Sequence, residues 1–371
     1  MTIVYIDDSP SEFMALADSG TAAIAAFTFQ NDDPNEQAFT AARTANVWLF
    51  DFFLVADPHD ENGLSLFQKW KATIGGRPTT VVVSSDVEKA VGEPLGPIER
   101  HHVIAQKHGV EWIGDKTKDT LNRVIELSDA TDFIAKNLDL TPIEGRPLGT
   151  YDSELLCLGV LGVPKDADWT NSAMRQIDRA RPPREVSTSS GPATAHSIIG
   201  WLLAHVLPYP SFLLTDAQAA LRLKIQPATF RSIVAEYEGN EAGAAQRGTI
   251  ETCKYLGPLK DFLGRRWWRA AIDDLAWHLS QDPDGYRAAL GKLASKTSID
   301  WLEHSEPVLI SNSYLVETDE IAEAKDCVRV TDEDFPANVD AAWILISSAQ
   351  EDRQLMAKVI YEDRDVLSFG E

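Results

Sequence analysis

The chain has 371 residues, 44% hydrophobic and 25% charged, which is typical of a soluble globular protein with two or three domains. The net charge of −23 argues against a protein that binds duplex DNA, because such a protein needs a basic surface to neutralise phosphates. The three cysteines lie far apart, which excludes a disulfide framework and a zinc motif of paired cysteines.

The sequence gives no sign of secretion or of a membrane segment. The N-terminus lacks the basic and long apolar regions of a signal peptide. The uncharged, largely apolar stretch 195–215 contains two histidines and two prolines, so we expect a buried helix that ends near Pro208 and not a membrane span. We therefore expect a cytoplasmic protein with no membrane partner.

Residues 1–135 alternate short apolar runs with amphipathic stretches. The apolar runs predict strands at 2–6, 24–29, 46–50, 79–83 and 110–113. The stretches between them predict helices at 10–18, 35–45, 63–74, 97–108 and 117–135. Short apolar strands separated by helices are typical of a parallel sheet covered on both faces. We therefore predict an α/β fold whose N-terminal domain is a doubly wound, five-stranded parallel sheet.

Polar side chains follow four of these five strands. They are Asp7 and Asp8, then Asp51, Ser84 and Lys116. Because ligands bind at the carboxyl ends of parallel strands, we expect these groups to meet at one edge of the sheet. Crowded carboxylates repel one another unless a hard cation neutralises them, and Mg²⁺ prefers such oxygen ligands. The hydroxyl and the ammonium group are the donors that a phosphoryl group needs.

The segments "YIDDSP", "VWLFDFFL", "TTVVVSSD" and "GVEWIGDK" resemble the receiver domain of two-component response regulators. The resemblance covers about the first 135 residues and all five strands. It implies that Asp51 accepts a phosphoryl group from a histidine kinase, in a reaction that the receiver itself catalyses with Mg²⁺. It also implies that Asp7, Asp8, Asp51 and the backbone carbonyl of Phe53 hold the Mg²⁺ ion. Ser84 and Lys116 would bind the phosphoryl oxygens.

Several positions depart from the family's pattern. Thr117 stands where a proline usually follows the lysine, and Ile113 stands at the position of the switch aromatic residue. The segments after Asp51 and after the fourth strand are longer than usual. We therefore expect the signal to leave the receiver through loops 52–62 and 86–97. The alternative is a domain that keeps the receiver fold and never takes phosphate.

The rest of the chain divides by composition and charge. Residues 136–150 mix proline and glycine without periodicity and predict a linker. Residues 151–300 hold 17 basic and 17 acidic residues and show helical periodicity, which predicts a mainly α-helical output domain. Residues 301–371 hold 5 basic and 17 acidic residues, with β-branched runs that end in "KVIYEDRDVLSF". They predict an acidic α+β segment, separate or part of the same output domain.

One segment of the middle region, 215–234, resembles a helix-turn-helix. Ala220, Leu223, Ile225 and Ile233 occupy its core positions, and Lys224 stands where the turn prefers glycine. Few basic residues lie on the second helix, so an ordinary helical hairpin is the preferred interpretation. A second cluster, "KDFLGRRWWRAA" at 260–271, combines basic residues with two tryptophans. It could bind an anion or a partner, but the preferred interpretation is a helix that packs its tryptophans inward.

These observations favour a signalling protein that takes phosphate from a histidine kinase and acts through protein contacts. Its partner would be another regulator or an effector protein, and a phosphate sink belongs to this class. Apart from its self-phosphorylation, we do not expect it to be an enzyme. Two alternatives stay open. One is a DNA-binding regulator that uses 215–234; the other is an effector enzyme with a site in 151–300.

Overall fold

A computed structural model describes residues 3–17, 24–29, 36–54, 62–74, 78–138, 152–183, 191–238, 250–294, 297–336 and 339–368. The chain forms two compact units. Unit 1 contains Met1–Gly162, Pro182–Ala204 and Gly257–Leu263; unit 2 contains Val163–Arg181, His205–Leu256 and Gly264–Glu371. The predicted boundaries at 135, 150 and 300 do not follow this division and stay predictions. Most of the predicted linker, 139–150, lies outside the described residues.

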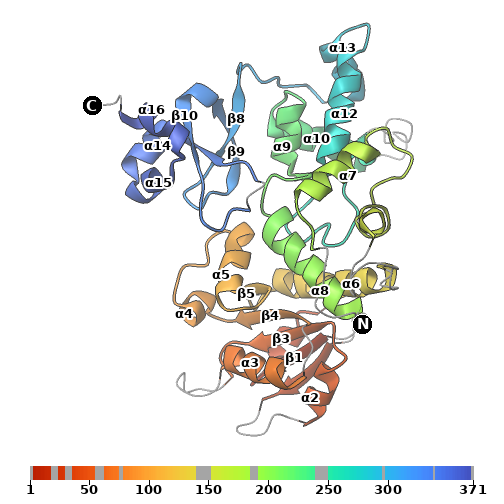
Figure 1. Cartoon of the computed structure of the whole chain (residues 1–371), viewed down its shortest axis with the longest axis vertical. Helices are drawn as coiled ribbons and strands as arrows, with labels where there is room; N and C mark the ends of the chain where they lie inside the picture. The colour runs from red at the N-terminus through yellow and green to blue at the C-terminus, as the bar shows by residue number, and fades with distance from the viewer. Residues whose placement is uncertain are drawn as a thin grey trace. The chain divides into compact units, whose positions relative to one another are not determined.

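The sheet of unit 1 is the predicted five-stranded parallel sheet (Figure 1). Its strands run in the order β2-β1-β3-β4-β5, which confirms the doubly wound fold class. The strands are β1 (Ile3–Asp7), β2 (Ile24–Thr28), β3 (Val47–Asp51), β4 (Thr79–Ser84) and β5 (Trp112–Asp115). Each predicted strand is present. β5 begins two residues later than predicted, because its pairing with β4 starts at Trp112 and not at Val110.

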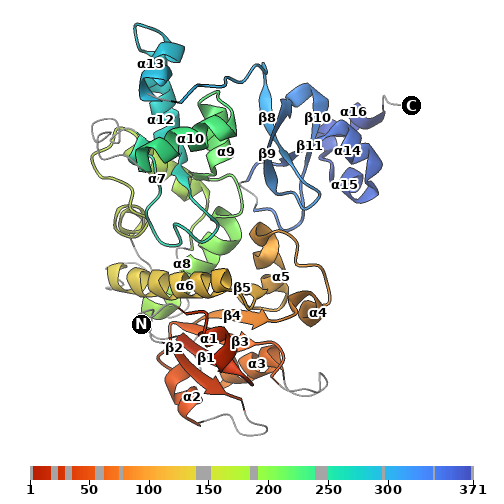
Figure 2. The same ribbon diagram turned by 180° about the vertical axis from the view of Figure 1, so that it is seen from behind.

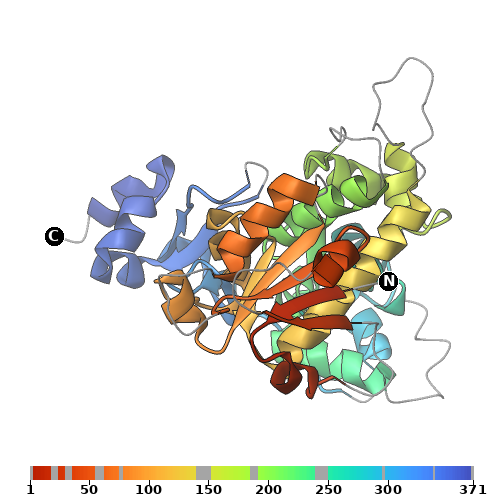
Figure 3. The same cartoon turned by 90° about the horizontal axis from the view of Figure 1, so that it is seen from below.

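Helices lie on either side of this sheet (Figure 3). They are α1 (Pro10–Met14), α2 (Glu36–Ala42), α3 (Gly63–Ile74), α4 (Val87–Val91), α5 (His101–Lys107) and α6 (Lys118–Asn137). All five predicted helices are present, whereas α4 was not predicted. It forms because Asp86 accepts a hydrogen bond from the backbone N–H of Lys89, and Gly92 ends the helix in the left-handed conformation.

The two faces of the sheet are packed by different helices. Alternate residues of β1 and β3, Val4, Ile6, Trp48 and Phe50, form one core with α2, α3 and α5. Tyr5 points to the other face, where its ring contacts Phe13 of α1. Burial of several aromatic side chains stabilises this sheet, since each contributes about 1.5–3 kcal/mol.

Helix α8 (Gly191–Trp201) also belongs to unit 1, where it packs against α6 (Figure 2). His196 of α8 lies 3.3 Å from a carboxylate oxygen of Glu111. The other carboxylate oxygen of Glu111 accepts the backbone N–H of Thr80 at 2.6 Å. A residue just before β5 thus connects the start of β4 to a helix from much later in the chain.

Unit 2 begins with helices and a short two-stranded sheet. The helices are α7 (Thr170–Arg179), α9 (Asp216–Arg222), α10 (Pro227–Glu238), α12 (Arg269–Ser280) and α13 (Tyr286–Leu293). The sheet pairs β6 (Leu213–Leu214) with β7 (Trp267–Trp268). Trp267 and Trp268 are buried as predicted, but they lie in a strand and not in a helix.

The last part of unit 2 is a small mixed sheet with three short helices. Its strands, in the order β10-β11-β8-β9, are β8 (Pro307–Ser311), β9 (Glu317–Glu323), β10 (Cys327–Val330) and β11 (Ala342–Leu345). The strand predicted in "KVIYEDRDVLSF" is wrong. Only Val359 bridges to the sheet, at Val330, and the chain then turns into α16 (Arg364–Ser368). The preceding helices are α14 (Ile346–Glu351) and α15 (Arg353–Lys358).

The three cysteines, Cys157, Cys253 and Cys327, are free and buried. Burial raises the pKa of the Cys157 and Cys327 thiols to about 11 and that of Cys253 to about 12. Within the described ranges, no helix combines the length and the apolar character that crossing a bilayer requires.

Candidate functional site: an acidic pocket

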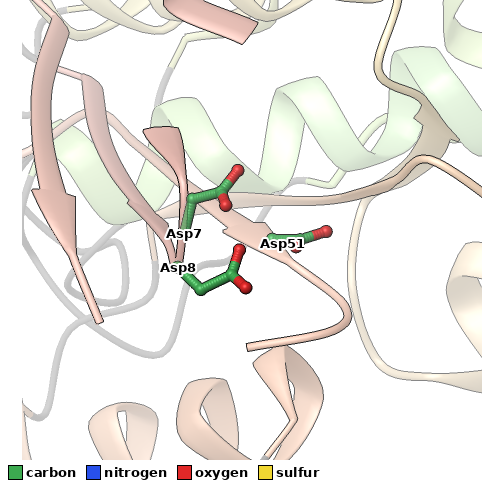
Figure 4. A group of neighbouring side chains, drawn as sticks. All are labelled: Asp7, Asp8 and Asp51. Carbon is green, nitrogen blue, oxygen red and sulfur yellow. The ribbon is translucent and has the colours of Figure 1, made fainter. Parts of the chain in front are cut away.

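The candidate site lies at the carboxyl edge of the unit 1 sheet, where Asp7 ends β1, Asp8 follows it and Asp51 ends β3 (Figure 4). Each of these residues offers a carboxylate oxygen, and the three atoms lie within 4.8 Å of one another. Asp7 and Asp51 are buried, whereas Asp8 is exposed. The predicted meeting of the three carboxylates is confirmed.

Lys116 brings the opposite charge to this group. Its Nζ lies 2.8 Å from Oδ2 of Asp7 and 3.0 Å from Oδ2 of Asp51. Burial lowers the pKa of the lysine, but its hydrogen bond to Asp7 and the charge of Asp51 outweigh burial, and the net pKa is raised. Lys116 therefore stays charged and connects β1 with β3 from the end of β5.

Two further contacts, which the sequence analysis missed, fix the Asp7 side chain. The hydroxyl of Tyr5 donates a hydrogen bond to Oδ2 of Asp7, and the backbone N–H of Ser9 donates to Oδ1 at 2.8 Å. The signal for Tyr5 was available, because residues two apart on a strand point to the same face. Asp7 is thus held in one orientation before any ligand arrives.

Asp51 is less completely paired than Asp7. Its Oδ1 atom is buried and has no hydrogen-bond partner. Burial raises the pKa of Asp51 to about 6, although the charge of Lys116 opposes this shift. For Asp8, burial and the neighbouring Asp7 also raise the pKa. A buried carboxylate oxygen without a partner is costly, so it marks a place where a ligand can bind.

A divalent cation fits these residues. Three ionised carboxylates and one ammonium group leave a formal charge of −2 in the pocket. The unpartnered Oδ1 of Asp51 and the exposed carboxylate of Asp8 have lone pairs to offer to a hard cation. Among the residues that the structure describes, Asp7, Asp8 and Asp51 form the one such group of three potential metal ligands.

Ser84 and Phe53 lie on segments that border the pocket. Ser84 ends β4, its carbonyl accepts the backbone N–H of Lys116 at 3.1 Å, and its hydroxyl accepts the N–H of Asp86 at 3.2 Å. The residue before Phe53, Phe52, donates its N–H to Val83 of β4 at 2.8 Å. These bonds place Ser84 and Lys116 on adjacent chains, while the predicted roles of Ser84 and the Phe53 carbonyl stay predictions.

Gly63 sets the distance between α3 and the end of β3. A Cβ atom at this position would lie 2.0 Å from the carbonyl oxygen of Asp51. The N–H of Gly63 donates to the carbonyl of Phe52 at 3.0 Å, which fixes the start of the helix beside the pocket. Only glycine permits this approach, so the backbone of Asp51 has little freedom to move.

The predicted helical hairpin at 215–234 is present as α9 and α10, and Lys224 in its turn adopts the left-handed conformation with φ of 58°. The charges on the hairpin are paired within unit 2. Arg231 of α10 contacts both carboxylate oxygens of Asp319, at 3.0 and 2.8 Å. Arg222 of α9 lies 2.6 Å from Asp273. The hairpin therefore presents no cluster of unpaired basic groups among its described residues.

The topology and the pocket together define a flavodoxin-like fold with a receiver-like acidic pocket. Comparisons with protein-family models, with curated proteins and with solved structures found no match to this chain.

Proposed function

We propose that unit 1 accepts a phosphoryl group on Asp51 in a reaction that depends on Mg²⁺, and that the donor is a histidine kinase. One observation carries the proposal. Three carboxylates and Lys116 meet at the carboxyl edge of a sheet ordered 2-1-3-4-5, and one buried oxygen of Asp51 has no partner. A structural ion pair needs neither the third carboxylate nor the unpartnered oxygen.

In the proposed reaction, a carboxylate oxygen of Asp51 attacks the phosphorus of phosphohistidine. A P–O bond forms, the P–N bond breaks, and the imidazole leaves with its electron pair and takes up a proton. With a pKa of about 6, Asp51 is mostly ionised at neutral pH and is a competent nucleophile. A Mg²⁺ ion held by Asp7, Asp8, Asp51 and the Phe53 carbonyl would neutralise charge on the transferred group.

Lys116 and Ser84 would bind the new phosphoryl oxygens. Lys116 already spans Asp7 and Asp51, so a small displacement of its Nζ keeps it paired with the phosphorylated side chain. Ser84 ends β4, the strand that pairs with β3 of Asp51, and its hydroxyl can donate a hydrogen bond. Catalysis would come from positioning and charge neutralisation, without a separate general base.

We propose that the output is a contact with another protein, either a regulator or an effector. The net charge of −23 and the paired arginines of α9 and α10 support protein contacts over DNA. A phosphate sink, which competes with another regulator for one kinase, belongs to the same class.

The experiment is phosphorylation by a small donor such as acetyl phosphate, followed by intact-protein mass spectrometry. We expect one added phosphoryl group in the presence of Mg²⁺ and none after chelation of the metal. Asp51→Asn should abolish the addition completely. Asp132→Asn is the matched control, because Asp132 is a carboxylate of α6 that pairs with Lys136 at the surface. Unchanged labelling of Asp51→Asn would contradict the assignment.

A further inference from the structure

A segment from the middle of the chain, Gly257–Leu263, belongs to unit 1 although the residues on either side of it belong to unit 2. Its anchor is Phe262, whose ring centroid lies 4.8 Å from that of Trp112 in an edge-to-face contact. Both side chains are fully buried. Trp112 belongs to β5, the strand that leads to Lys116. Such an aromatic pair adds about 0.5–1.5 kcal/mol beyond the burial of its area.

Two hydrogen bonds from α6 hold the backbone on either side of this anchor. Nε of Arg123 donates to the carbonyl of Phe262 at 2.9 Å, and the N–H of Asp261 donates to Oε1 of Glu126 at 2.9 Å. Arg123 and Glu126 lie three residues apart, so they share one face of the helix. The segment is therefore held by β5 and by α6 at once. We call this set of three contacts the 257–263 clasp.

The same two elements flank the lysine of the acidic pocket. β5 ends at Asp115, Lys116 follows it, and Thr117 caps α6 by accepting the N–H of Thr120. The strand and the helix are closely packed at this point. A Cβ on Gly114 would lie 3.1 Å from the Thr120 side chain and 3.6 Å from Nε1 of Trp112. With so little space between them, a displacement of the backbone at Lys116 would also move α6 or Trp112.

We propose that the 257–263 clasp senses the charge state of the acidic pocket and is released when Asp51 carries a phosphoryl group. The inference rests on the proposed function of that pocket. A phosphoryl group adds about −1.5 to −2 charge units beside Lys116. Lys116 moves to pair with it, and the end of β5 and the first turns of α6 follow. The three contacts of the clasp fit the positions that β5 and α6 have when Asp51 is unmodified. Movement of these two elements therefore separates Phe262 from Trp112 and weakens both hydrogen bonds.

Release of the clasp also affects unit 2, because the polypeptide continues into that unit at both ends of the segment. Leu256 and Gly264, which bound the segment, belong to unit 2. Release of the clasp therefore changes the freedom of two chain segments that enter unit 2. This route differs from the one expected through loops 52–62 and 86–97, and residues 55–61 of the first loop lie outside the described residues.

The test is hydrogen–deuterium exchange on the full chain with Mg²⁺, with and without beryllofluoride as the phosphoryl mimic. Fluorine NMR on the same samples reports whether the mimic is bound. When beryllofluoride is bound, we expect the amides of 259–263, above all that of Asp261, to exchange at least roughly fivefold faster. A factor of about five is at the lower end of the usual allosteric coupling between two sites.

A pair of variants separates sensing from simple packing. Arg123→Met removes the donor to Phe262, so we expect fast exchange at 259–263 even without the mimic, and a much smaller further increase. Arg43→Met is the matched control, because Arg43 is exposed just after α2 and its guanidinium group lies over the ring of Phe39. It should behave like the unsubstituted protein. Both variants should still bind beryllofluoride.

The possible failures are distinguishable. If beryllofluoride does not bind, the proposed function is wrong, and this inference is wrong with it. If it binds and exchange at 259–263 is unchanged, the inference alone is overturned. An increase confined to loops 52–62 and 86–97 would overturn it in the same way.

Discussion

The acidic pocket of unit 1 and the helical hairpin of unit 2 differ in how completely their charged groups are paired. In the pocket, three carboxylates face one lysine, and Oδ1 of Asp51 is buried without a partner. On the hairpin, Arg231 is bound by both oxygens of Asp319. Both regions attract attention in the sequence, yet only the pocket leaves a buried charged atom unsatisfied. A concentration of charge is therefore a weaker sign of function than a buried charge without a partner.

The largest effect is expected for a substitution at Gly63, which tests whether the backbone of the pocket is held rigidly. We expect Gly63→Ala to lower the free energy of unfolding by about 3 kcal/mol or more, because its methyl group would overlap the Asp51 carbonyl. The control is Gly291→Ala in α13, where a Cβ meets no atom within 4 Å and alanine favours the helix by about 1 kcal/mol. Urea unfolding measures both, and equal midpoints would show that the backbone at Asp51 can yield.

The next prediction concerns Glu126, a carboxylate with a raised pKa that lies outside the pocket, and tests whether a raised pKa alone indicates a metal site. Burial raises the pKa of Glu126 to about 7, but its Oε1 accepts the Asp261 N–H. The folded pKa lies above the ordinary value of 4.5, so the folded state holds the proton more tightly than the unfolded state. The contribution of Glu126 to stability should therefore be complete below pH 4.5 and be lost as pH rises through about 7, a change on the order of 2 kcal/mol after allowance for solvent screening.

Glu126→Gln keeps the acceptor for Asp261 and removes the titration. Thermal unfolding between pH 4.5 and 8 should show a smaller loss of stability in this variant than in the parent protein. This variant should keep a stabilisation by Mg²⁺, because Glu126 pairs with Asp261 in the 257–263 clasp and is not one of the three carboxylates of the pocket. Loss of the Mg²⁺ response would mean that Glu126 contributes to the metal site, and the contrast between the two sites would not hold.

A smaller effect, with opposite signs in two conditions, concerns Asp8. Burial and Asp7 raise the pKa of Asp8, so Asp8→Asn should stabilise the metal-free protein, by less than about 1 kcal/mol because Asp8 is exposed. The same variant should lose the stabilisation by Mg²⁺, which is about 1.4 kcal/mol at ten times the dissociation constant. Melting curves with and without Mg²⁺ give both quantities.

Asp319→Asn in unit 2 is the matched control for Asp8→Asn. It removes a carboxylate that is paired with Arg231, so it should destabilise the protein slightly, by about 0.2–1 kcal/mol, and equally with and without Mg²⁺. If Asp319→Asn stabilised the metal-free protein as Asp8→Asn should, the difference between paired and unpaired charge would have no energetic basis.

The smallest effect is an expected absence. The full chain should show no sequence-specific DNA binding in the nanomolar range at physiological salt, because its charge of −23 repels phosphates and the hairpin arginines are already paired. Selection from a pool of random duplexes tests this directly. One enriched motif, lost in Arg231→Ala, would make the hairpin a DNA reader and reverse the comparison.

The pocket could be predicted because its polar residues lie at the ends of strands, and the strands themselves are recognisable from the sequence. Asp7, Asp51 and Ser84 each end an apolar run, and parallel strands bring such ends together. The Oδ1 atom of Asp51 without a partner could not be predicted, because it depends on what Lys116 and Tyr5 leave free in three dimensions.

The 257–263 clasp was also beyond prediction. Arg123 and Phe262 are 139 residues apart, and no local periodicity reports so distant a contact. The segment "KDFLGRRWW" suggested one helix, whereas its first part docks in unit 1 and its tryptophans form β7. In "KVIYEDRDVLSF", the alternating pattern favoured a strand, but Asp363 pairs with Arg329 and the chain turns into a helix.

The burial of all three cysteines makes this chain convenient for spectroscopy. With thiol pKa values of about 11 to 12, Cys157, Cys253 and Cys327 are almost wholly protonated at neutral pH and shielded from reagents. A maleimide dye or a nitroxide should therefore react selectively with one cysteine introduced at the surface, without removal of the native thiols. A label placed on an exposed position such as Leu256 could then follow movement beside the 257–263 clasp in the intact protein.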